Sequence, residues 1–106
     1  MQPLEGVRVV DLSIGQMGPS ATASLADWVA EVVKIESRHG DPGRGVELQP
    51  DGTSAFFETH NRGKKSITLN LRHPDGKEAG LRLAERCDVF VQSWTPGTIE
   101  RLGLDY

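Results

Sequence analysis

Two short apolar runs that flank a glycine-containing segment limit the fold of this chain more than any other feature. Residues 7–12 (VRVVDL) are rich in β-branched side chains and lie between glycines, which is typical of a buried strand. A helix of small residues is predicted to open at Pro19 or Ser20, and residues 31–36 (EVVKIE) form the second run. Two strands joined by one helix within about 30 residues predict a right-handed βαβ unit.

The same alternation continues along the chain. Residues 66–71 (SITLNL) alternate apolar and polar side chains, residues 73–87 have the spacing of an amphipathic helix, and residues 88–93 (DVFVQS) form another apolar run. A short helix is expected at 96–103. Residues 37–63 are rich in glycine, proline and charge, which predicts a long loop with at most one turn of structure. We therefore predict an α/β fold with an open, mostly parallel sheet and flanking helices.

Composition argues against several classes of protein. The net charge of −3 over 106 residues argues against a nucleic-acid binder, which is normally basic. No apolar run approaches the roughly 18 residues of a membrane span, and the start MQPLEG lacks the features of a signal peptide. The single cysteine, Cys87, is expected to be an ordinary thiol. We expect a cytoplasmic location, and the ending RLGLDY directly after a helix suggests a chain cut short at a domain boundary.

Ligands of open parallel sheets bind at the carboxyl ends of the strands. Here that edge carries residues 13–18, Ser37 and Arg38, Arg72, and residues 93–97. Basic residues are frequent in the same parts of the chain: Arg38, Arg44, Arg62, Lys64, Lys65 and Arg72. Each alone is most simply a solvated charge, but together on one sheet edge they would meet several phosphates. Trp94 would stack on a flat base or pack in the core.

The loop after the first strand admits three interpretations. It does not match the dinucleotide fingerprint G-x-G-x-x-G, because the glycines that should follow Gly15 fall on Met17 and Ser20. Glu36 does stand 21 residues after Gly15, where a ribose-binding acid would lie. A simple turn eased by Gly15 and Gly18 is the second interpretation. The third, a different phosphate-bearing ligand at the helix start, is favoured because free N–H groups there attract anions.

No catalytic or metal-binding group stands out from the sequence. The histidines lack the paired spacing of metal ligands: they are His39, His60 and His73. The serines near the opening loop have no nucleophile-elbow context: they are Ser13, Ser20 and Ser24. Asp11 ends a strand and Asp27 lies on a helix, and neither is predicted to be a catalyst.

Six separated motifs occur in order over the whole chain: PLEGVRVVDLS, GP before a small-residue helix ending in LAD, AEVVKIE, GDPGR, NRGKKSITLNL and DVFVQSWTPGTIERLGLDY. This series resembles the N-terminus of family III CoA-transferases, which include formyl-CoA:oxalate and carnitine CoA-transferases and the α-methylacyl-CoA racemases. The resemblance implies a Rossmann-like domain that binds coenzyme A, in enzymes whose two subunits interlock. Residues 1–106 would then be the N-terminal, CoA-binding segment of a larger domain.

The resemblance also implies which residues contact CoA. These are Ile14, Gly15, Gln16 and Met17 after the first strand, Arg38 after the second, Leu69 and Arg72 near the third, Ser93 and Trp94 after the fourth, and Arg101 in the last helix.

The family's chemistry lies outside these residues. In the transferases an aspartate forms mixed anhydride intermediates with the acyl group, and that aspartate lies beyond residue 106, as do the histidine and aspartate of the racemases. A transferase that moves CoA between two carboxylic acids is the favoured interpretation. A racemase, a CoA-binding module without activity and, last, an NAD-dependent oxidoreductase are the alternatives. The expected partners are acyl-CoA, a carboxylic acid and a second subunit of a homodimer, with no metal, nucleic acid or membrane.

Overall fold

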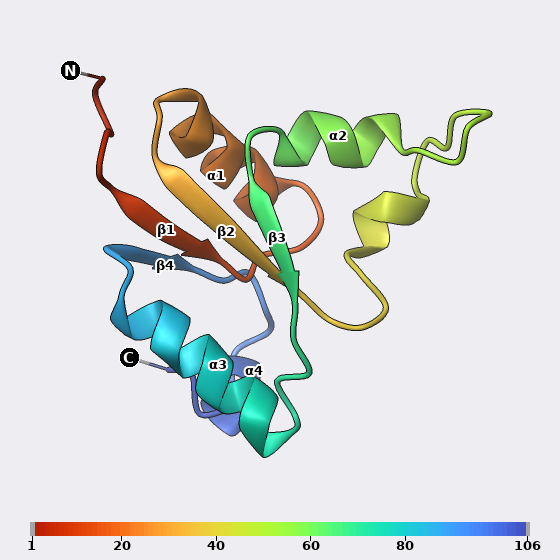
Figure 1. Ribbon diagram of the computed structural model, residues 1–106. Helices are drawn as coiled ribbons and strands as arrows, with labels where there is room; N and C mark the ends of the chain where they lie inside the picture. The colour runs from red at the N-terminus through yellow and green to blue at the C-terminus, as the bar shows by residue number, and fades with distance from the viewer. Residues whose placement is uncertain (1, 106) are drawn as a thin grey trace.

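The computed structural model describes residues 2–105. Within this range four parallel strands form one sheet in the order β3–β2–β1–β4 (Figure 1). The strands are β1 (Arg8–Asp11), β2 (Glu31–Glu36), β3 (Lys65–Thr68) and β4 (Val89–Val91). The register pairs Val9 with Val32 and with Val89, so β1 lies at the centre of the sheet. The predicted α/β fold with an open parallel sheet is confirmed.

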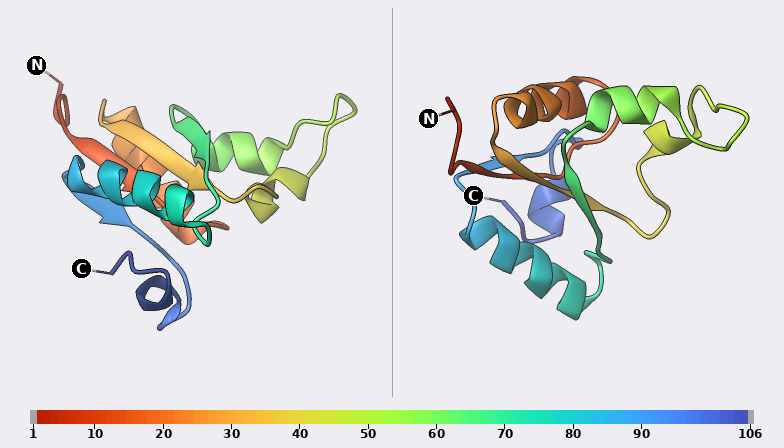
Figure 2. Two further views of the ribbon diagram at one scale, coloured as in Figure 1. Left: turned by 60° about the horizontal axis from the view of Figure 1, so that its bottom comes forward. Right: turned by 45° about the horizontal axis from the view of Figure 1, so that its top comes forward.

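Helices cover both faces of the sheet (Figures 1 and 2). One face carries α1 (Met17–Asp27) and α2 (Ala55–Asn61), and the other carries α3 (Pro74–Glu85) and α4 (Thr98–Arg101). Among the described residues, no helix has both the length and the apolar character that a membrane span requires.

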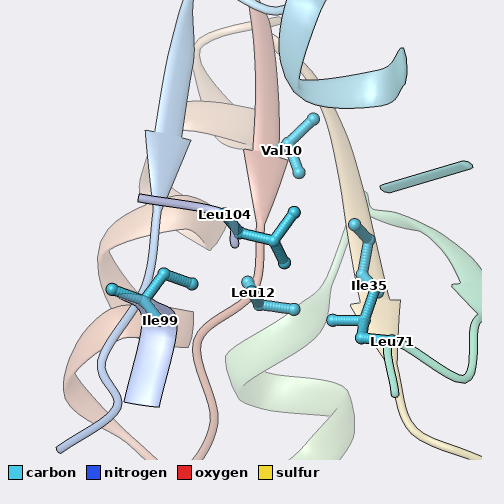
Figure 3. Close-up of a cluster of buried hydrophobic side chains, with 6 residues drawn as sticks. All are labelled: Val10, Leu12, Ile35, Leu71, Ile99 and Leu104. Carbon is cyan, nitrogen blue, oxygen red and sulfur yellow. The ribbon is translucent and has the colours of Figure 1, made fainter. Parts of the chain in front are cut away.

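The alternation of side chains along β1 explains why both faces are covered. Val9 and Val32 pack with Ala30 beneath α1, whereas Val10 points to the opposite face. There it joins the cluster drawn in Figure 3, whose members come from three strands or strand ends and from the α4 region: Val10, Leu12, Ile35, Leu71, Ile99 and Leu104. Each such side chain contributes about 1.5–3 kcal/mol of hydrophobic free energy when it is fully buried.

The segment predicted as a long loop contains more structure than expected. It forms a short 3-10 helix, η1 (Pro42–Gly45), and the seven-residue helix α2. The prediction of at most one turn is wrong because Ser54 is a helix N-cap: its Oγ accepts a hydrogen bond from the Phe57 N–H at 3.0 Å and donates one to the Gly43 oxygen at 2.9 Å. Residues 42–61, called the arm from here on, project beside β3 beyond the sheet (Figure 2).

Local packing sets the ends of the other elements. α1 begins at Met17, earlier than predicted, and Pro19 lies in its first turn, where a missing N–H costs nothing. β3 stops at Thr68 because the chain turns at Asn70, against which α3 packs closely. A Cβ on Gly76 would lie 2.0 Å from the Asn70 oxygen, so this helix position requires glycine. Cys87, half-buried after α3, donates its thiol proton to the Ala84 oxygen.

Candidate functional site

A cleft of about 740 Å³ opens at the carboxyl ends of the strands, as expected for an open parallel sheet. Its walls come from the loops after β1, β2 and β3 and from the segment that joins β4 to α4. Six of the predicted CoA-contacting residues line it together: Ile14, Arg38, Leu69, Arg72, Trp94 and Arg101. These residues come from four separate parts of the sequence, and the parallel topology brings them to one place.

Three arginines give the cleft a cationic rim. Arg38, Arg72 and Arg101 are exposed, and within residues 2–105 the structure records no ion pair for any of them. Arg101 Nη2 donates a hydrogen bond to Thr98 Oγ1 at 3.1 Å, and Gly97 beside it has φ +93°. A Cβ at Gly97 would lie 3.1 Å from the Arg101 guanidinium, so glycine leaves this side chain room. Uncompensated guanidinium groups favour binding of a phosphate-bearing ligand.

The floor of the cleft is apolar. Trp94 and Leu69 are half-buried and pack against the cluster of Figure 3, while Ile14 is 44% exposed at the edge. An indole face and two aliphatic side chains between guanidinium groups suit a ligand that carries both a flat or extended organic part and phosphates.

Four predicted site residues lie outside the cleft lining. Gln16 and Met17 border a separate shallow hollow along α1, and Met17 is 84% exposed. Gly15 forms the turn before them, with φ +83°. Ser93 instead holds the neighbouring wall, because its Oγ accepts from the Ile14 N–H at 3.2 Å and donates to the Ile14 oxygen at 3.4 Å.

The prediction that six basic residues gather on one edge is wrong for four of them. Only Arg38 and Arg72 line the cleft. The others lie elsewhere: Arg44 pairs with Glu36 at 2.6 Å, Arg62 with Asp27 at 2.7 Å and Lys64 with Asp11 at 2.8 Å, while Lys65 begins β3 at its amino end. Lys65 lies away from the cleft because it begins its strand, whereas the cleft is at the carboxyl ends. The other three are held by ion pairs with nearby carboxylates.

Glu36 is not free to bind a ribose. Its Oε2 accepts from Arg44 Nε at 2.8 Å and from the Asp41 N–H at 2.8 Å, and its Oε1 accepts from Arg44 Nη2 and from Ser66 Oγ at 2.8 Å. The Arg44 guanidinium, helped by these other donors, lowers the pKa of Glu36 to about 2 despite its burial. The arrangement removes the residue on which the NAD interpretation depended.

A second buried acid, Asp11, joins β1 to α1 and to the segment that leads into β3. Its Oδ2 accepts from Thr22 Oγ1 at 2.6 Å and from Lys64 Nζ at 2.8 Å, and its Oδ1 accepts from the Ser13 N–H at 2.9 Å. Burial raises the pKa of Asp11, but the hydrogen bonds from Lys64, Ser13 and Thr22 together outweigh it, so the pKa lies below its ordinary value. Burial lowers the pKa of Lys64. With both oxygens engaged, Asp11 has a structural role.

Sequence reasoning missed this network, as it missed the buried Lys34 described below. The available signal was an aspartate followed two residues later by serine at the end of a buried strand, a spacing that favours a local side-chain to backbone hydrogen bond. Within the part of the chain that the structure describes, no group of three His, Cys, Asp or Glu side chains is placed to hold an ion. His73 instead caps α3, its Nδ1 accepting from the Asp75 N–H at 3.2 Å.

Comparison with models of known protein families identifies the family of this chain. The family model described as CoA-transferase family III matches residues 4–106. The chain belongs to CoA-transferase family III.

Named members of CoA-transferase family III are similar over nearly the whole chain. A formyl-CoA:oxalate CoA-transferase of Streptomyces coelicolor is 45% identical over 104 residues, which are 97% of this chain and 25% of that protein. A succinyl-CoA:glutarate CoA-transferase of Mus musculus is 42% identical over 112 residues, covering 100% of this chain and 25% of that protein. The chain therefore spans about a quarter of the length of these relatives.

Solved structures of the family share the fold. The crystal structure of Rv3272 from Mycobacterium tuberculosis superposes with a TM-score of 0.91 at 39% identity, over 99% of this chain and 29% of that one. A CAIB/BAIF family protein from Brucella suis gives a TM-score of 0.91 at 37% identity, with the same two coverages. The Rossmann-like arrangement expected from the resemblance to CoA-transferase family III is confirmed by this agreement.

Proposed function

We propose that residues 1–106 form the CoA-binding segment of a Rossmann-like domain, in an enzyme that transfers CoA between two carboxylic acids. The observation that carries the proposal is the cleft, where Arg38, Arg72 and Arg101 lack acidic partners among the described residues and surround an apolar floor. CoA has the matching chemistry: several phosphates, one adenine ring and a long, partly apolar arm.

The proposed contacts divide by chemistry. Arg38, Arg72 and Arg101 bind the phosphates as bidentate donors, and Trp94 with Leu69 takes the adenine. Ile14 lies at the edge of the cleft. An arm leaving past Ile14 would next meet Gly15, Gln16 and Met17, and Ser93 keeps that loop in place through the Ile14 main chain.

The similarity to proteins named as CoA-transferases favours transfer over racemisation. The reaction would then use an acyl-CoA and a free carboxylic acid, and family membership is also the basis for proposing a homodimer and a cytoplasmic location. We assign no catalytic residue within residues 2–105. The buried carboxylates that border the cleft, Glu36 and Asp41, are both engaged in ion pairs, with Arg44 and Lys34.

Calorimetric titration of the purified chain with CoA, with NAD as the comparison ligand, tests the proposal. We expect saturable CoA binding at one site per chain and no heat of binding for NAD. Binding of NAD without CoA would contradict the assignment of the cleft.

A second experiment separates binding from chemistry. The chain is incubated with an acyl-CoA and a free carboxylic acid, and exchange of the acyl group is followed by chromatography. We expect no exchange, because the carboxylates beside the cleft are occupied by internal partners. Turnover by this chain alone would show that a catalytic group lies within it.

A further inference from the structure

Lys34 is a charged residue at the centre of the sheet, and its side chain is only 1% exposed. A buried ammonium group is costly to desolvate, so its position is determined by the groups that compensate it. Two such groups surround Lys34 Nζ: the Ser13 main-chain oxygen at 3.0 Å and Asp41 Oδ2 at 2.8 Å. Ser13 follows β1 and Asp41 follows β2, so a single side chain bridges two loops.

The first contact fixes one wall of the cleft. The peptide between Ser13 and Ile14 is held at both ends, because its oxygen accepts from Lys34 and its N–H donates to Ser93 Oγ at 3.2 Å. The preceding N–H, that of Ser13, donates to Asp11 Oδ1 at 2.9 Å. Ile14, which lines the cleft, therefore follows two successive peptides whose orientation is set by three hydrogen bonds.

The second contact fixes another wall of the cleft. The Asp41 side chain is 1% exposed; its Oδ1 accepts from the Gly43 N–H at 2.8 Å, and its own N–H donates to Glu36 Oε2 at 2.8 Å. These bonds shape the loop of residues 37–42, all of which line the cleft. Lys34 itself does not line the cleft.

We propose that Lys34 is a positioning residue that sets the spacing of the two cleft walls, and through it the affinity for the phosphate-bearing ligand. The second half of this inference rests on the proposed function, because it takes CoA as the ligand. A purely structural ion pair would contribute to folding stability and leave the cleft unchanged. The two roles differ in what happens when both charges of the pair are removed together.

Trp94 supplies a probe of the cleft that needs no ligand. The chain has two tryptophans, and Trp28 is 55% exposed at the end of α1, outside the cleft lining. In a Trp28→Phe background, Trp94 is the only tryptophan, so its emission reports the environment of the cleft floor.

The test combines Lys34→Met with Asp41→Asn in that background. The pair of substitutions leaves no buried charge without a partner, and the introduced amide would keep an oxygen for the Gly43 N–H. We expect Trp94 emission to move to longer wavelength without ligand, and the CoA dissociation constant to rise about tenfold, the effect of losing one charged hydrogen bond. The matched control is Val32→Ala, which removes buried volume beneath α1 and should lower the melting temperature without changing either readout.

Three results would overturn the inference. If the double variant only lowers the melting temperature, Lys34 is structural. If emission shifts but the dissociation constant does not, the walls move without consequence for binding. If Val32→Ala produces the same changes, they report general loosening. Should the unsubstituted chain not bind CoA at all, the proposed function fails, and the Trp94 emission alone decides whether Lys34 positions the walls.

Discussion

The network beneath the cleft and the rim above it use basic residues in opposite ways. Beneath the cleft, Lys34 and Lys64 are buried and each lies 2.8 Å from a carboxylate oxygen. On the rim, Arg38, Arg72 and Arg101 are exposed, and the part of the chain described by the structure gives them no acidic partner. The comparison shows that a net charge of −3 conceals a local cationic site, because the carboxylates that border the cleft, Glu36 and Asp41, are already paired with Arg44 and Lys34.

Burial explains the difference between the two regions. A desolvated charge needs a partner to be tolerated, whereas a hydrated one does not. The network therefore fixes geometry and the rim remains available to a ligand. Substitutions in the network should lower stability, and at Lys34 they should also weaken binding through the cleft walls. Substitutions on the rim should change mainly binding.

The largest expected effect is in the network. Asp11→Ala leaves the Lys64 ammonium buried without its carboxylate, and we expect the free energy of unfolding to fall by about 3–5 kcal/mol. Urea denaturation measures this loss. Adding Lys64→Met should recover part of it, since no buried charge then lacks a partner. A loss below about 1 kcal/mol would place this pair with ordinary surface ion pairs.

The next effect is on the rim. Arg72→Ala and Arg101→Ala should each weaken CoA binding by about 1–3 kcal/mol, because each removes a charged hydrogen-bond donor to phosphate. Calorimetric titration gives the affinity, and urea denaturation should show unchanged stability. Arg82→Ala is the control, since Arg82 is exposed on α3 outside the cleft and pairs with Glu78. Unchanged CoA affinity in both cleft variants would contradict a ligand-binding role for the rim.

The pH dependence of stability tests Glu36, a buried and paired carboxylate that borders the cleft. The pKa of Glu36 is lowered from 4.5 to about 2, so its charged form is favoured in the folded state. Its stabilisation is fully present above pH 4.5 and is lost as the pH falls from 4.5 to about 2. We expect this part of the acid loss, on the order of 1–2 kcal/mol, to disappear in Glu36→Gln.

Urea denaturation at several values of pH measures this effect, and an equally steep acid loss in the variant would assign it to other groups. Arg44 is the main cause of the lowered pKa of Glu36, and its guanidinium also stacks over the Phe57 ring at 3.8 Å. The ion pair between Arg44 and Glu36 therefore attaches the arm to β2.

The smallest effect is expected at the surface. Arg62 and Asp27 form an ion pair at 2.7 Å, but both side chains are 48% exposed. Arg62→Ala should change the free energy of unfolding by about 0–1 kcal/mol, and less at high salt. Denaturation at two salt concentrations measures this. A loss of unfolding free energy above about 2 kcal/mol would contradict the view that exposed ion pairs contribute little to stability.

The sequence predicted the sheet well because periodicity reports burial directly. The runs around Val9, Val32 and Phe90 could be recognised as strands, and the position of their carboxyl ends followed from parallel topology. The arm was missed because α2 depends on a hydrogen bond between Ser54 and Gly43. These residues are eleven positions apart, so local helix propensity does not reveal the contact.

The candidate site was predicted in part for a related reason. The family motifs located Arg72, Trp94 and Arg101, and the structure gathers them in one cleft. The sequence did not reveal which basic residues have carboxylate partners, because Lys64 and Asp11 are 53 residues apart. Charge is a property of a residue, whereas its availability is a property of the fold.

The central position of β1 has a consequence for how the chain folds. β1 comes first in the sequence, yet one of its neighbours is β4, with Val9 opposite Val89. Closing this pairing requires the ends of a segment of about 80 residues to meet, and such distant pairings slow folding. During synthesis β1 therefore remains with an unpaired edge until residue 91 has left the ribosome. We expect early misfolding and chaperone contact to concentrate at this edge.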